Sequence, residues 1–206
     1  MEVILSDIGK RFNSQWIFKG ITHTFLPNSI SALTGNNGSG KSTLLQIIYG
    51  FQTYSRGKIS WELNNESLID ETLPGKISLA APYLELPEEF TLEEMLRFHF
   101  SIVPPKTANS KEEMLKSAGL AGQEQKFIKH FSSGMKQRLK LLLAFYSNSP
   151  LLLLDEPCSN LDENGINWYR NILEANIGQR TIIIASNQTF EYQGCQSIIN
   201  VSQFRP

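Results

Sequence analysis

A glycine-rich stretch of nine residues, Gly35–Thr43, constrains the fold of this chain more than any other feature. It follows the apolar, β-prone run Ile30–Leu33 and leads into the helix-prone run Leu44–Ile48. A strand, a glycine loop and a helix in this order are typical of a phosphate-binding loop. The glycines let the backbone turn sharply and aim several N–H groups at one point, where the positive end of the helix also favours an anion. The stretch therefore predicts a nucleotide-binding α/β fold, and a glycine turn without a ligand is the alternative.

The residues of this loop have separate expected roles. The Lys41 ammonium is expected to reach the β- and γ-phosphates, and the Ser42 hydroxyl is expected to hold Mg²⁺. The predicted nucleotide-binding residues of the loop are Gly35, Asn36, Asn37, Gly38, Ser39, Gly40, Lys41, Ser42 and Thr43.

Two adjacent carboxylates follow a second apolar run. Leu151–Leu154 leads directly into Asp155 and Glu156. A buried parallel strand delivers both acids to its carboxyl end, where open α/β sheets bind their ligands. We expect Asp155 to hold Mg²⁺ and Glu156 to polarise the attacking water. A strand that ends in a solvated acidic turn is the alternative, but the pair favours a hydrolase over a small-molecule kinase.

The rest of the chain predicts one domain with an inserted helical lobe. Short β-type runs cover residues 3–8 and 16–25, and Thr91 and Ser110 each open a helix with a capping box. A third helix starts near Ser133, and strands alternate with helices again from Leu151. We expect residues 1–81 and 148–206 to form a P-loop core with a mixed or parallel sheet and an N-terminal antiparallel portion. Residues 82–147 form the lobe.

Composition excludes several other classes of protein. Lysine plus arginine number 19 against 20 aspartate plus glutamate, so no basic field predicts nucleic-acid binding. Apolar runs such as Ile182–Ala185 are far shorter than the roughly 20 residues that span a bilayer, and the N-terminus lacks signal-peptide features. The two cysteines, Cys158 and Cys195, suit a reducing cytosol. We expect a cytoplasmic chain whose link to a membrane comes through a partner.

A second serine-glycine stretch, Phe131–Arg138, precedes the third helix. Taken alone, it is typical of a simple helix cap. Together with the motifs on either side, Ser132 and the N–H groups at the helix N-terminus predict a second anion site. One chain does not need two such sites. Two chains facing head to tail would each supply the second site to the other's γ-phosphate.

These motifs resemble those of the nucleotide-binding subunits of ABC transporters, in the same order over residues 12–188. Gly35–Thr43 is similar to the Walker A motif and Phe131–Arg138 to the ABC signature. Leu151–Pro157 is similar to the Walker B motif, and Ser159–Asp162 to the D-loop. The resemblance implies an ATP-sandwich dimer, with ATP and Mg²⁺ as cofactors, that drives a membrane partner.

The resemblance also implies roles for single residues. Phe12 falls where the family has an aromatic ring that stacks on adenine, and a core position is the alternative. Ser132 and Gly134 are implied to contact the partner's γ-phosphate. Glu156, Lys41 and Asn187 are the implied catalytic residues, Asn187 because it occupies the position of the family's switch histidine.

The chain departs from the family pattern at three places. In the signature, Ser133 replaces a glycine and Met135 replaces a glutamine. Asn187 replaces a histidine, which is expected to slow turnover without abolishing it. The Q-loop glutamine is missing, with Pro82 near its place, so nucleotide binding should be intact and the coupling route altered. The candidates to approach the metal instead are Glu85, Glu88 and Glu89.

The leading interpretation is an ATP-hydrolysing subunit of an ABC transporter, peripheral on the cytoplasmic face of the membrane. It would dimerise with itself or with another such subunit and dock a transmembrane permease around Pro82–Phe90, where a plain hinge loop is the alternative. A regulatory half of a heterodimer that barely hydrolyses ATP is the second interpretation, and a non-transport ABC ATPase acting on DNA or ribosomes is the third. The compact chain resembles small exporters, including the haem-exporter type, and we expect no regulatory C-terminal domain.

Overall fold

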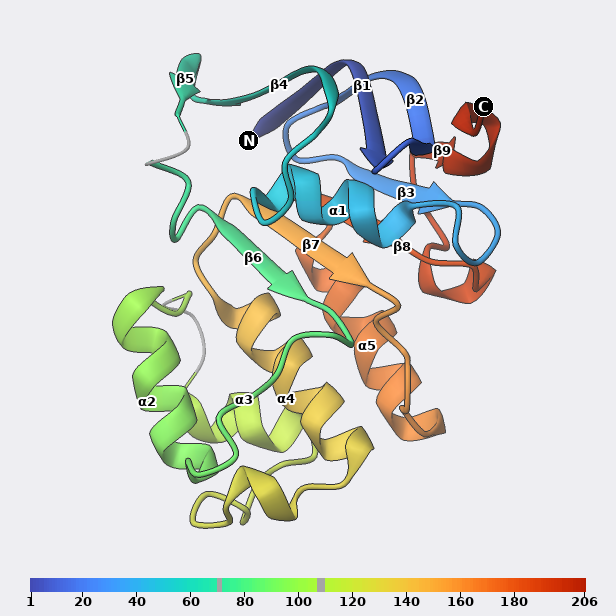
Figure 1. The fold of residues 1–206 in the computed structure, drawn as a ribbon. Coiled ribbons are helices and arrows are strands. Elements are labelled where there is room, and N and C mark those ends of the chain that lie inside the picture. Colours follow the sequence, from blue (N-terminus) through green and yellow to red (C-terminus); the bar gives the residue numbers. More distant parts are fainter. Residues whose placement is uncertain (70–71, 107–109) are drawn as a thin grey trace.

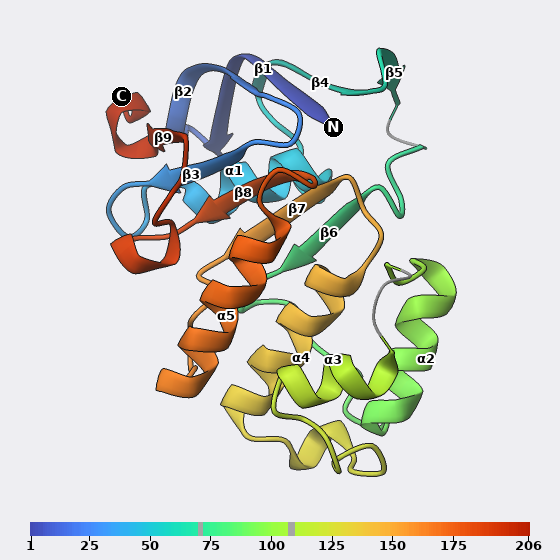
Figure 2. The ribbon, with the colours of Figure 1, turned by 180° about the vertical axis from the view of Figure 1, so that it is seen from behind.

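The structure is a computed structural model that describes residues 1–69, 72–106 and 110–206, so residues 107–109 of the expected lobe lie outside the described residues. Figures 1 and 2 show it from opposite sides. The strands are β1 (Glu2–Phe12), β2 (Gln15–Phe25), β3 (Ile30–Thr34), β4 (Arg56–Leu63), β5 (Glu66–Leu68), β6 (Ile77–Ala80), β7 (Leu151–Asp155), β8 (Thr181–Ala185) and β9 (Ser197–Asn200). The α-helices are α1 (Lys41–Tyr49), α2 (Leu92–Ile102), α3 (Lys111–Ser117), α4 (Ser133–Tyr146) and α5 (Glu163–Asn176), and short 3₁₀ turns are η2 (Ile128–His130), η3 (Thr189–Glu191) and η4 (Val201–Phe204).

Two sheets confirm the predicted α/β fold with an N-terminal antiparallel portion. The parallel sheet has the strand order β6-β7-β8-β3-β9, and the antiparallel sheet has the order β2-β1-β4-β5. Every residue of β7 and β8 is buried, which explains why both strands are almost uninterrupted apolar runs. The parallel strands β3, β7 and β8 end together, and this edge carries the glycine loop and both acids.

The helices begin where the sequence predicts. Thr91 and Ser110 each accept a hydrogen bond from the glutamate N–H three residues on, and that glutamate side chain accepts from the cap N–H. The α4 helix starts at Ser133 behind the Ser132 cap. The helices α2 and α3 lie on the far side of α4 from the parallel sheet, as Figures 1 and 2 show.

The parallel sheet separates two apolar clusters. Leu152 and Leu154 of β7 pack with the helices α2 to α5, whereas Leu151 and Leu153 pack with α1 and the antiparallel sheet. Successive side chains of a strand point to opposite faces, so one strand supplies both clusters. The buried residues of α1 pack with residues of both sheets, and the N-terminus of this helix lies at the carboxyl edge of the parallel sheet.

Candidate functional site

The glycine loop has the backbone geometry of a phosphate cradle. Gly40, the residue before α1, has φ +101°, and a Cβ there would lie 2.7 Å from side-chain atoms of Ile17 and Phe18. Gly35 has φ +131°, and a Cβ there would lie 2.6 Å from Ser202 Oγ. Both conformations are strained for a residue with a side chain, so the glycines are needed for the shape of the loop.

Lys41 lies folded over this loop. Its Nζ donates to the carbonyl oxygens of Gly35 at 2.9 Å and Asn36 at 3.3 Å. Burial lowers the pKa of Lys41, while the nearby carboxylates of Glu156 and Asp155 act in the opposite direction. An ammonium held only by two carbonyls in a buried position is ready to pair with an anion entering the loop.

Asp155 is a buried carboxylate without a matching donor. It is 1% exposed, and neither carboxylate oxygen has a hydrogen bond of normal geometry from the described residues. Burial raises its pKa to about 6, with the Ser42 hydroxyl acting in the opposite direction. Unpaired buried carboxylates are costly, so this side chain fits a positively charged ligand.

The same donors fit Mg²⁺. This ion is usually held by one or two carboxylates together with phosphate oxygens and waters. Residues 1–69, 72–106 and 110–206 contain no group of three or more His, Cys, Asp or Glu side chains placed to hold a metal. A site built from Ser42, Asp155 and the phosphates of a nucleotide agrees with both observations.

Glu156 has a strained backbone at the end of β7. Its φ is +42°, a left-handed conformation that costs about 1–2 kcal/mol for a residue other than glycine. Its N–H donates to the Ala185 carbonyl at 2.9 Å. The residue lines the cavity of about 260 Å³ over the loop and the adjoining one of about 540 Å³. Strained residues cluster at active sites, which supports a chemical role for this one.

Asn187 lies beside the glycine loop. It follows β8, lines the larger cavity with Glu156, and its Nδ2 donates to Asn37 Oδ1. The structure thus brings the residue in the switch position together with the phosphate loop and the acidic pair.

The predicted adenine-stacking residue, Phe12, lies at the end of β1. The residue is 48% exposed, and Lys10 Nζ lies 4.7 Å from the ring centroid. Lys10 itself is buried and donates to the Thr53 carbonyl at 2.6 Å. The exposed ring face is available to a flat ligand.

The second predicted anion site is not beside the first. Ser132 caps α4 and accepts from the Met135 N–H at 3.2 Å. Gly134 packs against the segment after β7, where an added Cβ would lie 2.9 Å from the Asn160 carbonyl oxygen. Figures 1 and 2 both show the loop before α1 at the edge of the parallel sheet, whereas α4 begins in the helical part of the molecule, away from that sheet. One chain therefore holds two separate half-sites, the glycine loop with the acidic pair and the Ser132 end of α4.

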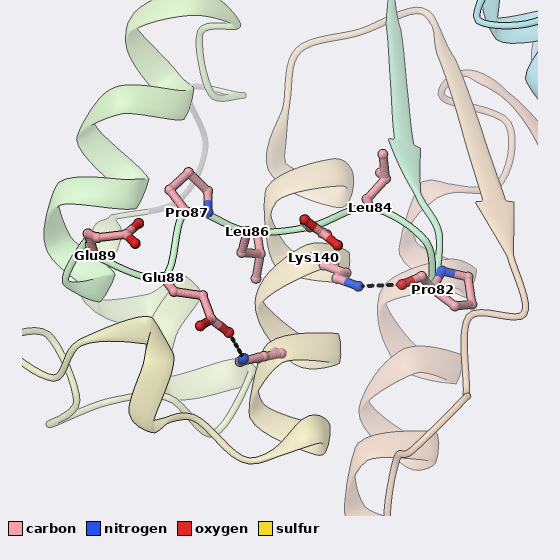
Figure 3. A pocket seen from close by; sticks show the side chains of 9 residues that line it. Pro82, Leu84, Leu86, Pro87, Glu88, Glu89 and Lys140 are labelled. Atoms are coloured by element: carbon pink, nitrogen blue, oxygen red, sulfur yellow. Dashed lines mark hydrogen bonds and ion pairs between the residues drawn. The ribbon is translucent and has the colours of Figure 1, made fainter.

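The glutamates after Pro82 lie in a separate groove. This groove has a volume of about 750 Å³, and within it Glu88 Oε1 lies 2.5 Å from Lys136 Nζ. Figure 3 shows the lining side chains. Glu85 and Glu89 line the same groove, and none of the three is among the groups that shift the pKa of Asp155. The lining of this groove does not include Ser42 or Asp155, and the expectation that one of these glutamates approaches the metal stays a prediction.

Tyr83 is a neighbour of the acidic pair that feels the charge of Asp155. Burial raises its pKa to about 12, and the second largest cause is the charge of Asp155. In the parallel register Ala80 pairs with Leu154, so the chain after β6 leaves the sheet beside Asp155. Sequence reasoning missed this tyrosine because it considered only glutamine and carboxylates at that junction.

Two other side chains near the site were also missed. Ser202 of η4 accepts from the Asn36 N–H at 3.0 Å and so supports the phosphate loop. Glu191 is 2% exposed and lines the larger cavity beside Glu156 and Asn187. No motif in the sequence identifies Ser202 or Glu191. The one signal for Glu191 is that a carboxylate stands four residues after Asn187.

Comparison with known proteins agrees with this geometry. The ABC transporter family model matches residues 18–159. An uncharacterized ABC transporter ATP-binding protein of Haemophilus influenzae is 34% identical over 162 residues, which are 78% of this chain and 65% of that protein. The cytochrome c biogenesis ATP-binding export protein CcmA of Saccharophagus degradans is 25% identical over 200 residues, or 92% of this chain and 88% of that protein.

A solved structure shares the fold over the whole chain. It is a putative ABC transporter ATP-binding protein from Pyrococcus furiosus, with a TM-score of 0.83, 23% identity and full coverage of both chains. The two sheets, the glycine loop before α1 and the acids after β7 therefore occur together in a chain whose sequence matches this family over most of its length. The chain belongs to the ABC transporter family, as an ATP-binding subunit.

Proposed function

We propose that this chain hydrolyses ATP in a sandwich dimer and thereby drives a transmembrane permease. The observation that carries the proposal is Glu156, a carboxylate on a strained backbone between the phosphate loop and Asn187. A chain that only binds ATP has little need of a carboxylate there.

The chain's own residues divide the reaction between them. The loop N–H groups and Lys41 bind the β- and γ-phosphates and stabilise the charge that develops on them. Glu156 orients a water molecule and accepts its proton, while the Asn187 amide donates to the γ-phosphate. Mg²⁺, when bound by Ser42 and Asp155, would neutralise phosphate charge.

Two chains are needed to complete each site in this proposal. Ser132 and the first N–H groups of α4 would cover the γ-phosphate bound by the partner chain. The separation of the two half-sites within one chain supports a head-to-tail arrangement. Either two copies of this chain or a pair with a related subunit would satisfy it.

The membrane partner is proposed to dock in the groove of Figure 3, between the segment after β6 and α4. Its lining mixes apolar, acidic and basic side chains: Pro82, Leu84, Glu85, Leu86, Pro87, Glu88, Glu89, Lys136 and Lys140. Within the described residues no helix has the length and apolar character to cross a bilayer. We therefore propose a peripheral position on the cytoplasmic face, and the similarity to an export protein supports export as the direction.

Steady-state ATP turnover of the purified chain across protein concentration tests the proposal. Turnover should rise faster than linearly with concentration, because the active species is a dimer. It should vanish in Glu156→Gln while ATP binding remains, since the amide cannot accept the proton. Unchanged turnover in that variant would sink the assignment.

The other reading is a regulatory half of a heterodimer, which binds ATP and barely hydrolyses it. The amide of Asn187 in place of a group that can carry a charge favours it. Tight ATP binding without turnover, and copurification with a second ABC subunit in a fixed ratio, would establish this reading instead.

A further inference from the structure

A buried carboxylate bridges the two segments that carry Glu156 and Asn187. Glu191 of η3 is 2% exposed. Its Oε1 accepts from the Cys158 N–H at 2.8 Å, and its Oε2 accepts from the Ser186 hydroxyl. Its own carbonyl accepts from the Tyr169 hydroxyl at 2.7 Å. Both carboxylate oxygens are therefore used, one on each segment.

The position of this bridge follows from where the sheet ends. The strands β7 and β8 pair up to Asp155 and Ala185, and the last main-chain bond between them runs from the Glu156 N–H to the Ala185 carbonyl. Beyond that bond the two chains diverge around the larger cavity. The Glu191 side chain supplies the next cross-link, in place of the missing backbone pairing.

The bridge lies in a longer polar chain. On one side, Gln137 of α4 donates through Nε2 to the Pro157 carbonyl at 2.8 Å, next to Cys158. On the other side, Ser186 precedes Asn187, whose amide donates to Asn37 of the phosphate loop. Hydrogen-bonded contacts thus run from the helix of one half-site to the loop of the other, and Glu191 is the only side chain of the described residues that bonds to both diverging segments.

We propose that Glu191 is a positioning residue that makes the segment after β7 and the segment after β8 move as one body. It keeps Glu156 and Asn187 at a fixed separation, so that Glu156 contacts the water while Asn187 contacts the γ-phosphate. The inference rests on the proposed ATP hydrolysis.

A positioning role and a simple packing role predict different effects of a substitution on kcat, nucleotide affinity and thermal stability. Among the described residues, the Glu191 carboxylate bonds to Cys158 and Ser186 and not to the glycine loop, so its loss should leave nucleotide affinity nearly intact. Misplacing one of two groups that act on the same reaction should reduce kcat, because small displacements at a reacting centre cost much in rate. A residue that only stabilised the fold would lower thermal stability and leave kcat of the folded fraction unchanged.

The test compares three substitutions in the full chain. Glu191→Leu removes both bonds and should lower kcat at least about tenfold, with the Kd for ATP within about threefold. Glu191→Gln retains one acceptor for the Cys158 N–H and an amide for the Ser186 oxygen, so it should recover most of kcat. Ser149→Ala removes another buried hydroxyl, bonded to Ser78 and remote from the site, and is the control for stability.

Hydrogen exchange is measured on the same variants and needs no turnover. In Glu191→Leu, peptides covering 156–160 and 186–188 should both lose protection, whereas Ser149→Ala should change neither. If Glu191→Leu does not fold, Ser186→Ala removes one of the two bonds and should cause a smaller loss of both protection and kcat.

Unchanged protection in both segments would overturn the inference, as would a loss of kcat in Ser149→Ala equal to that in Glu191→Leu. A wild-type chain without turnover would refute the proposed hydrolysis. In that case the coupled exchange of the two segments still decides whether Glu191 joins them.

Discussion

In the proposed reaction, Asn187 is the residue whose contribution to catalysis is expected to be weakest. Its side chain donates to Asn37, a residue of the phosphate loop, so an incoming γ-phosphate must displace that contact. An amide cannot carry charge at any physiological pH, and a hydrogen bond from a neutral group contributes about 0.5–1.5 kcal/mol against about 1.5–3 for a charged one. The position is therefore where a single substitution should increase activity.

Asn187→His should raise kcat for ATP roughly five- to thirty-fold, the rate equivalent of about 1–2 kcal/mol. The physical reason is that an imidazolium strengthens the bond to the γ-phosphate as charge accumulates there. Steady-state turnover at saturating ATP measures the effect.

Asn187→Ala is the matched control, and it should reduce kcat below that of the wild type. A histidine variant no faster than the alanine variant would show that this position does not contact the γ-phosphate.

At the scale of elements, local signals predicted most of what the structure contains. The capping boxes at Thr91 and Ser110, the glycine loop and the apolar runs of β7 and β8 act over a few residues, and all are found at the expected places. The short strand β9 was not predicted. It has only four residues and is formed because its backbone pairs with β3 far away in sequence.

The supporting contacts of the site could not be predicted for the same reason. Glu191 meets Cys158 across 33 positions, and Lys140 of α4 donates to the carbonyls of Ala81 and Pro82 across more than 50. Such pairs depend on which elements become neighbours, and no local pattern of residues encodes them. Sequence identified the residues expected to do chemistry but not those that hold them.

The segment after β6 yields a prediction for the docking groove. Glu88 is engaged with Lys136, so reversing its charge would also break a contact within the chain. Glu89 lines the groove and is the cleaner probe. Glu89→Lys should lower by several-fold the amount of tagged chain retained on membranes of the source cells, because it places a repelling charge in the groove.

Glu174→Lys makes the same charge change on exposed α5, outside the groove, and should leave membrane retention unchanged. Equal retention of the two variants would discard the docking proposal.

At the scale of the whole molecule, the glycine loop and the Ser132 end of α4 lie apart within one chain, which makes the proposed dimerisation testable by a change at Ser132 alone. Aspartate caps helices as well as serine does, so Ser132→Asp should leave α4 intact. Its charge would, however, repel the γ-phosphate bound by the partner chain. In a Glu156→Gln background with ATP and Mg²⁺, the added Ser132→Asp should abolish a dimer seen by size-exclusion chromatography with light scattering, while ATP binding to the monomer persists.

Ser110→Asp in the same background is the control, since it changes an N-cap serine of α3 in the same way. A dimer that survives Ser132→Asp would mean that the signature serine does not face the partner's nucleotide.

The alternation of side chains along β7 has a consequence for how this molecule melts. Neighbouring leucines of that strand belong to different apolar clusters, one with the phosphate loop helix and one with the signature helix. If either cluster unfolds, the strands that it shares with the other cluster lose the packing on one of their faces. The two clusters should therefore unfold cooperatively. The glycine loop and the N-terminal region of α4 therefore belong to one thermodynamic unit. A destabilising substitution in either apolar cluster lowers the stability of both regions.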